Sequence, residues 1–168
     1  MRRFSLLFAF VFAFLTLALP ASATFAAPQA QPTADPAAQM QRVIELVNQR
    51  RKEAGVGPVT FNAALATCAQ KYSEVQAQQG KIDHTGPDGS NPGQRLRACG
   101  YNWKHYGENL AAGYANAEDV VNAWMNSPSH RKVMLNGKYK EIGMGFTRRD
   151  DDPGHYYDYF VMELGTRK

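Results

Sequence analysis

The stretch Glu141-Ile142-Gly143-Met144-Gly145-Phe146-Thr147 alternates large apolar residues with small or polar ones. This period of two is typical of a strand with one buried face. A second strand is predicted from Tyr156 to Leu164, where aromatic and β-branched residues are dense. The segment 148–154 between them is charged and contains proline and glycine, which indicates a turn. The last third of the chain is therefore expected to form a hairpin.

Upstream of the hairpin the apolar residues follow a helical period. After the pair Asp35-Pro36, four of them recur at i, i+3, i+4 and i+7, namely Met40, Val43, Ile44 and Val47. They predict a capped helix that ends at Gly55. Further helices are predicted over 62–80, 90–100 and 116–127, with 101–113 extended or irregular. Another is predicted from Ser127-Pro128 onward, with Ser127 as its cap and Pro128 at its first position. Helices around a small, mainly antiparallel sheet make the expected class α+β.

Three short polar segments lie where these elements begin or end. They are Asp83-His84-Thr85-Gly86-Pro87-Asp88-Gly89-Ser90, Gly107-Glu108-Asn109-Leu110 and Ser127-Pro128-Ser129-His130-Arg131. Each carries one residue able to bind a metal or move a proton: His84, Glu108 and His130. If one cleft collects them, two imidazoles and a carboxylate would form either a divalent-cation site or an acid/base site.

A purely structural role is open for each of these three residues. His84 sits in a glycine-rich loop, where a histidine can stabilise a turn. Glu108, if buried, needs a partner, and backbone amides or Arg131 would serve. His130 in the first turn of a helix can be a partly buried contact, and a helix N-terminus favours its neutral form.

In their order along the chain, these motifs resemble the CAP superfamily, the secreted domains related to cysteine-rich secretory proteins, antigen 5 and plant pathogenesis-related protein 1. The short bacterial branch is the most similar. The motifs that carry the resemblance are residues 47–51, Asp83-His84, Gly107-Glu108-Asn109, Trp124, Ser127-Pro128-x-His130-Arg131 and Glu141-Ile142-Gly143-x-Gly145. The resemblance implies that residues 39–168 form an α-β-α sandwich with a central antiparallel sheet and an open cleft.

In that family the cleft holds two histidines and acidic partners, and in several members a divalent cation such as zinc. The resemblance therefore implies a metal set of His84, Glu108 and His130. Animal and plant members place a glutamate near the position of Ser127 and a histidine near Tyr159, and this chain has neither, so the fourth site residue stays open. Glu163 is not added, because strand alternation turns it to the face opposite Met162.

Three functions remain possible at this stage. The first is a site for a divalent cation or a small ligand. The second is a weak hydrolase of peptide, peptidoglycan or ester, in which Glu108 or a histidine activates water. No GxSxG motif is present, and neither cysteine is placed as a nucleophile. The third is a module that binds lipid or another extracellular partner without catalysis.

The amino terminus predicts export. Arg2 and Arg3 precede an apolar run from residue 4 to 19, and Ala21-Ser22-Ala23 is a small-x-small cleavage pattern. We expect a signal peptide over 1–23, with a retained anchor as the alternative, then a flexible Ala/Pro/Gln-rich leader over 24–38. No later segment has spanning length, so no membrane span is expected in the mature chain. Secretion, to the exterior or the periplasm, follows.

Charge and cysteine content fit an exported binding domain. Without Arg2 and Arg3 the chain keeps 17 basic and 15 acidic residues, a net charge of about +2, so no nucleic acid partner is expected. The two cysteines, Cys68 and Cys99, are either bridged or two buried thiols. Export favours the disulfide, which would close a loop of about 30 residues and contribute roughly 3–4 kcal/mol.

Overall fold

The computed structural model describes residues 35–168. The predicted signal peptide and most of the predicted leader lie outside these residues. The described chain contains five helices and four strands, in this order: α1 Pro36–Glu53, β1 Thr60–Phe61, α2 Ala63–Gln79, α3 Pro92–Ala98, β2 Trp103–Ala112, α4 Ala117–Asn126, α5 Pro128–Met134, β3 Glu141–Arg148 and β4 Asp158–Arg167. Among these residues, none of the helices combines the length and apolar character needed to cross a bilayer.

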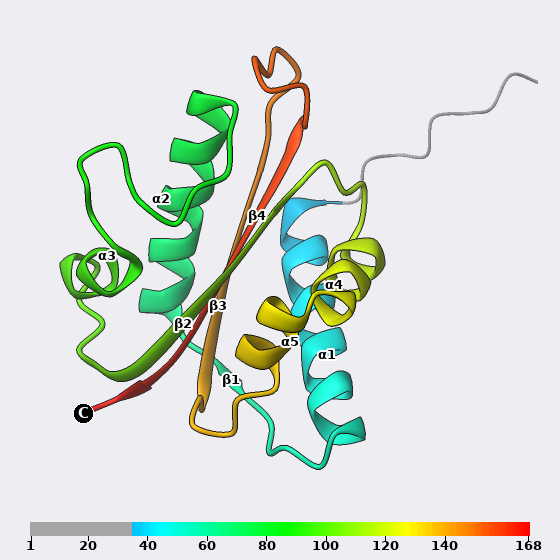
Figure 1. Ribbon diagram of the computed structural model, residues 1–168, viewed down its shortest axis with the longest axis vertical. Helices are drawn as coiled ribbons and strands as arrows, with labels where there is room; N and C mark the ends of the chain where they lie inside the picture. The colour runs from blue at the N-terminus through cyan, green and yellow to red at the C-terminus, as the bar shows by residue number, and fades with distance from the viewer. Residues whose placement is uncertain (1–34) are drawn as a thin grey trace, which may run out of the picture. The chain divides into compact units, whose positions relative to one another are not determined.

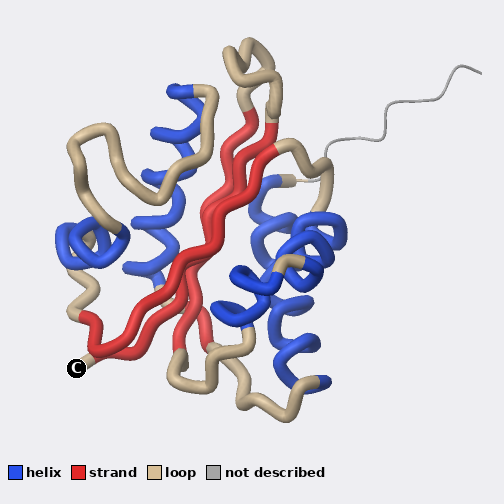
Figure 2. Tube along the Cα trace, in the orientation of Figure 1, coloured by secondary structure: helices blue, strands red, loops and turns tan. Residues whose placement is uncertain are grey.

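The four strands form one sheet in the order β1-β3-β4-β2 (Figure 1). β3 and β4 are the predicted hairpin and pair antiparallel, and β2 pairs antiparallel with β4 and forms an edge of the sheet. The two-residue β1 pairs parallel with β3. Helices α2 and α3 cover one face, and α1, α4 and α5 cover the other (Figure 2). The expected α-β-α sandwich and the α+β class are therefore confirmed.

Local capping explains where most helices begin. Asp35 accepts a hydrogen bond from Ala37 N (3.1 Å) with Pro36 in the first turn, as predicted, so residues 36–38 of the expected leader are helical. Asn62 accepts from Leu65 N at the start of α2. Asn91 and Gln94 form a capping box at α3. Ser127 occupies the predicted N-cap position of α5 and Pro128 follows it, but the Ser127 side chain makes no cap hydrogen bond.

Helix α2 lies directly on β3 because two glycines of β3 have no side chain. A Cβ at Gly143 would collide with the backbone of Leu65 and Ala66, and one at Gly145 with that of Ala69. The alternation that predicts the strand therefore also sets how closely the helix approaches. The predicted disulfide joins Cys68 of α2 to Cys99 at the end of α3, with the two Cα atoms 5.6 Å apart.

The opposite face of the sheet carries the larger apolar core, under α1, α4 and α5. Trp124 of α4 is buried there and donates its indole N–H to the carbonyl of Leu110 in β2 (3.0 Å). Arg51 is fully buried and donates to four carbonyl oxygens, those of Gly57, Met134, Asn136 and Tyr139. These bonds tie the end of α1 to the segment that leads into β3.

Candidate functional site

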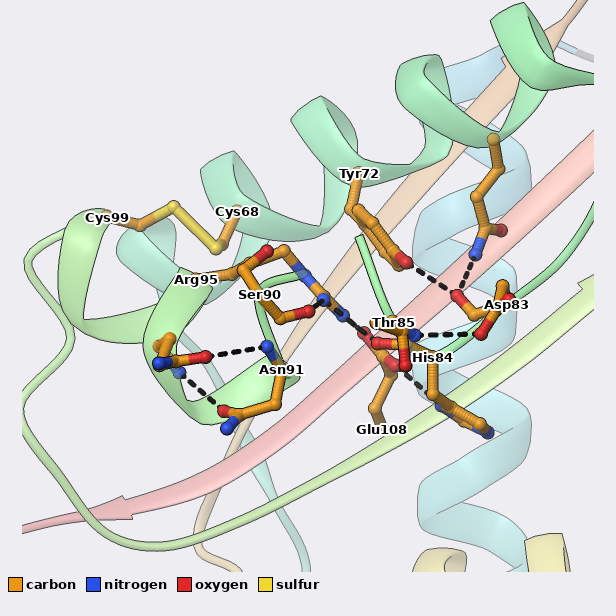
Figure 3. Close-up of polar contacts among 12 residues, drawn as sticks. Cys68, Tyr72, Asp83, His84, Thr85, Ser90, Asn91, Arg95, Cys99 and Glu108 are labelled. Atoms are coloured by element: carbon orange, nitrogen blue, oxygen red, sulfur yellow. Dashed lines mark hydrogen bonds and ion pairs between the residues drawn. A yellow bond between two sulfur atoms is a disulfide. The ribbon is translucent and has the colours of Figure 1, made fainter. Parts of the chain in front are cut away.

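Glu108 is the centre of a polar cluster between the edge strand β2 and helices α2 and α3. Its side chain is only 2% exposed, and both carboxylate oxygens are engaged. Oε1 lies 2.6 Å from Nδ1 of His84, and Oε2 accepts a 2.6 Å hydrogen bond from Nη2 of Arg95 (Figure 3). The partner that a buried Glu108 needs is therefore Arg95 together with His84, and neither backbone amides nor Arg131.

The loop that carries His84 is held from both sides. The side chain of Asp83 accepts from the backbone of Thr85 (2.9 Å), and the carbonyl of Asp83 accepts from the hydroxyl of Tyr72 (2.5 Å). Arg95 donates Nη1 to the carbonyl oxygens of His84 and Ser90, both at 3.0 Å (Figure 3). Because one guanidinium binds both the loop and Glu108, it fixes the imidazole against the carboxylate.

Arg95 and Tyr72 belong to this polar cluster, and the sequence did not predict that they would. The guanidinium carbon of Arg95 lies 3.5 Å from the centroid of the Tyr72 ring, a cation–π contact on a side chain that is only 12% exposed. Tyr72 belongs to the apolar stripe of α2, and Arg95 to a short helix, where each has an ordinary structural explanation. The capping box at Asn91 and Gln94 marks the start of α3, but it does not indicate which α3 residue contacts Glu108.

The two histidines have opposite electrostatic surroundings. The hydrogen bond to Glu108 raises the pKa of His84, and outweighs its burial. Burial lowers the pKa of His130, and the nearby charge of His84 lowers it further. His130 therefore stays neutral at neutral pH, while His84 holds a proton more readily than a free imidazole.

His130 lies across the edge strand from Glu108. Its carbonyl oxygen accepts from Asn109 Nδ2 (3.0 Å), and neighbouring residues of a strand point to opposite faces. The structure thus joins His84 and Glu108 in direct contact and brings His130 within electrostatic reach of His84. Within residues 35–168 no group of three His, Cys, Asp or Glu side chains is arranged to hold a metal ion. The three-ligand metal set stays a prediction.

Glu163 lies beside Glu108 in the buried part of the same cluster. It is fully buried and pairs with Glu108 across β2 and β4. Neither of its carboxyl oxygens accepts a hydrogen bond from a donor group among residues 35–168, so the neighbour left to it is Glu108. Burial, followed by the charge of Glu108, raises its pKa well above the usual range. Strand alternation places Glu163 on the face of β4 opposite to Met162, as predicted. That face is the one on which Glu108 lies.

Comparison with known proteins agrees with this fold and these motifs. The profile of the cysteine-rich secretory protein family, CAP, matches residues 44–164. The chain belongs to this family. The uncharacterised protein YkwD of Bacillus subtilis is 35% identical to this CAP chain over 109 residues, which are 65% of this chain and 42% of that protein. This chain therefore spans less than half of that relative.

The similarity to Borrelia proteins extends over a larger share of those proteins than the similarity to YkwD does. An uncharacterised protein of Borreliella burgdorferi is 30% identical over 122 residues, 73% of this CAP chain and 75% of that protein. The solved structure of an outer surface protein from Borrelia burgdorferi superposes with a TM-score of 0.73 at 28% identity, and covers 80% of this chain and 96% of that one. The recognition of a CAP domain from its motifs is confirmed.

The donor set of this CAP domain fits a metal at its imidazoles better than at its carboxylate. Glu108 has both oxygens engaged, by His84 and Arg95. His84 uses Nδ1 toward Glu108, and its side chain is 56% exposed, which leaves Nε2 for a ligand. Metal-bound histidines commonly bond a carboxylate through the other ring nitrogen in this way. Glu108 therefore suits the role of orienting a ligand.

Proposed function

We propose that this CAP domain is an exported binding protein whose site takes a divalent cation such as zinc, held by the imidazoles of His84 and His130. The observation that carries the proposal is the 2.6 Å contact between His84 Nδ1 and Glu108 Oε1. The carboxylate fixes the tautomer and orientation of His84, so that Nε2 faces outward as a ligand. His130 would be the second ligand, because burial favours the neutral form that a metal requires.

Export, to the exterior or to the periplasm, is part of the proposal. The Arg2-Arg3 and apolar amino terminus supports it, and so does the bond between Cys68 and Cys99, since disulfides persist in oxidising compartments. The Borrelia relative of known structure is an outer surface protein, which agrees with export. A bound cation would act as a Lewis acid or as a bridge to an anionic ligand.

Calorimetric titration of the purified chain with zinc chloride tests the site. Wild type should bind zinc, while His84→Ala and His130→Ala should each abolish measurable binding. Glu108→Gln should weaken it by about 10–100-fold, because the orienting carboxylate is lost. The matched control is His155→Asn, which removes an exposed histidine whose φ of 58° asparagine tolerates. Equal zinc binding by wild type and by the double variant His84→Ala with His130→Ala would refute the proposal.

A second candidate is hydrolysis with His84 as the general base. It is favoured by the same pair, because a half-exposed imidazole oriented by a buried carboxylate is the arrangement of a catalytic base. Cleavage of a peptide, peptidoglycan or ester panel that survives chelator and disappears in His84→Gln, with His155→Asn as control, would support it. Cleavage that persists in both His84→Gln and Glu108→Gln would exclude it. Lipid binding stays a prediction from the resemblance.

A further inference from the structure

Two surface hollows share Asn136 as a lining residue, and neither is lined by His84 or Glu108. The first has a volume of about 670 Å³ and lies at the junction of α4 and α5. The second, of about 280 Å³, lies between the start of β2 and the segment that leads into β3. We call the two together the basic groove, because its charged residues are Lys104, Arg131, Lys132 and Lys138.

The basic groove is one-sided in charge. Its four cationic side chains belong to exposed residues, and no aspartate or glutamate lines either hollow. None of the four has a carboxylate within ion-pair distance among residues 35–168, as the ion pairs of that part of the chain show. The mature chain is nearly balanced, at 17 basic and 15 acidic residues. Positive charge is therefore concentrated locally in the basic groove.

A third hollow, between α1 and the N-terminal end of α4, differs because it contains carboxylates as well as a cation. It is lined by Arg42 together with Glu45 and Glu118, and Arg42 pairs with both carboxylates, at 3.4 Å and 2.8 Å. Like charges that gather in a hollow without partners repel one another, and they focus a positive potential outward. Such a surface attracts an anionic partner.

We propose that the basic groove binds an anionic polysaccharide. A linear chain of acidic sugars would place its carboxylates against the lysines and Arg131 as it passes from one hollow to the other. The amides of Asn126 and Asn136, which also line the groove, suit sugar hydroxyls. The proposal does not depend on a cation at His84 and His130.

Two other classes of polyanion fit the groove less well. Single-stranded nucleic acid needs open aromatic faces on which bases stack. The ring of Trp103 is instead packed against Arg97, at 4.3 Å, and against Tyr106, at 4.5 Å between centroids. An acidic peptide would add as a strand to the edge of β2. Two carbonyl oxygens of that strand already accept side-chain bonds, from the hydroxyl of Tyr139 and the indole of Trp124.

Binding of polygalacturonate oligomers to the purified chain, measured by calorimetry, tests the proposal. The groove variant is Lys132→Glu with Lys138→Glu. The control variant is Lys52→Glu with Lys71→Glu, which reverses two exposed lysines on other surfaces and changes the net charge equally. We expect the groove variant to bind roughly tenfold more weakly, because each reversal replaces an attraction by a repulsion. The control and His84→Ala should bind like wild type.

Three results would overturn the proposal. One is the absence of measurable polygalacturonate binding by wild type at low salt. Another is an equal loss in the groove and control variants, which would reduce the effect to net charge. The third is tighter binding of poly-glutamate or of a single-stranded DNA oligomer than of polygalacturonate, which would assign the groove to another class of partner. Circular dichroism melting of both double variants confirms that each is folded when it is titrated.

Discussion

Glu108 and Glu163 face each other across the two adjacent strands β2 and β4, one with both oxygens bonded and the other with neither. Two buried carboxyl groups at directly opposite positions of neighbouring strands do not ionise together without a large electrostatic cost. The pKa of Glu163 is therefore raised, and Glu163 stays protonated beside the contacts that Glu108 makes with His84 and Arg95.

Glu163→Gln is expected to stabilise the fold by about 1–3 kcal/mol at neutral pH, because a neutral amide replaces a buried acid. The pKa of Glu163 is raised in the folded state. Its contribution to stability is thus fully present below the unfolded value, about 4.3, and is lost as pH rises toward the folded value. Urea unfolding at pH 4 and pH 8 should show a gain for the variant that grows with pH. A variant that is less stable than wild type at pH 8 would contradict this protonation state.

Glu108→Gln is expected to lower the pKa of His84. The hydrogen bond to Glu108 is the main reason that this pKa is raised, and burial acts in the opposite direction. The charged imidazole of His84 therefore contributes to folding stability below the unfolded pKa of about 6.5, and this contribution disappears as pH rises through the folded pKa. NMR titration of the histidine ring protons measures it directly. An unchanged His84 titration in Glu108→Gln, with the His155 signals as internal reference, would show that the two side chains are not bonded in solution.

Arg95→Lys is expected to destabilise the protein by about 2–4 kcal/mol. A lysine cannot bind Glu108 and the carbonyl oxygens of His84 and Ser90 at once, and it leaves a buried carboxylate poorly paired. Thermal unfolding and hydrogen exchange of the 83–90 loop measure the effect. The control is Arg97→Lys, since Arg97 is exposed and its guanidinium lies over the ring of Trp103, away from Glu108 and the loop carbonyls that Arg95 binds. Equal losses of stability in Arg95→Lys and Arg97→Lys would show that the contacts of Arg95 with Glu108 and the loop do not stabilise the fold.

Asp152→Asn is expected to loosen the β3–β4 turn and to remove an acid-sensitive element. Burial alone would raise the pKa of Asp152, but hydrogen bonds from the backbone of Tyr157, Gly154 and Tyr156 and from the Tyr159 hydroxyl lower it to about 2. The ionised Asp152 therefore contributes to folding stability above about pH 4, and this contribution is lost as pH falls toward 2. We expect a loss of about 1–3 kcal/mol at pH 7 by urea unfolding. The difference from wild type should shrink below pH 3, and a constant difference would exclude the linkage.

Much of the fold was predictable because its signals are local. Asp35, Asn62 and Asn91 cap helices through bonds to amides two or three residues away, which the sequence displays directly. The alternation around Gly143 and Gly145 predicted β3, and the same glycines admit α2. Ser127 also stands at the N-cap position of α5, as its residue type predicts, but its hydroxyl lies 3.2 Å from that of Ser129 and makes no cap bond.

The site was only half predictable. Its motifs named His84, Glu108 and His130, yet they did not supply Arg95 or Tyr72, whose residue types are common on helices. Strand alternation gives the correct face relative to Met162 for Glu163, and still does not assign it to the site. The missing information was the identity of that face, which depends on which strand β4 lies beside and in which register.

The amino-acid sequence alone predicted the helix ends and the hairpin, because these depend on residues close together in the chain. It also predicted the family, from the order of the motifs, and it left the disulfide as one of two alternatives for the two cysteines. Only the tertiary structure decided that Arg95 binds Glu108, that Glu163 lies beneath it, and that four cations share one groove. These relationships join residues from separate elements, and they come into being only when the sheet register and the packing of α2, α3 and α5 place them together.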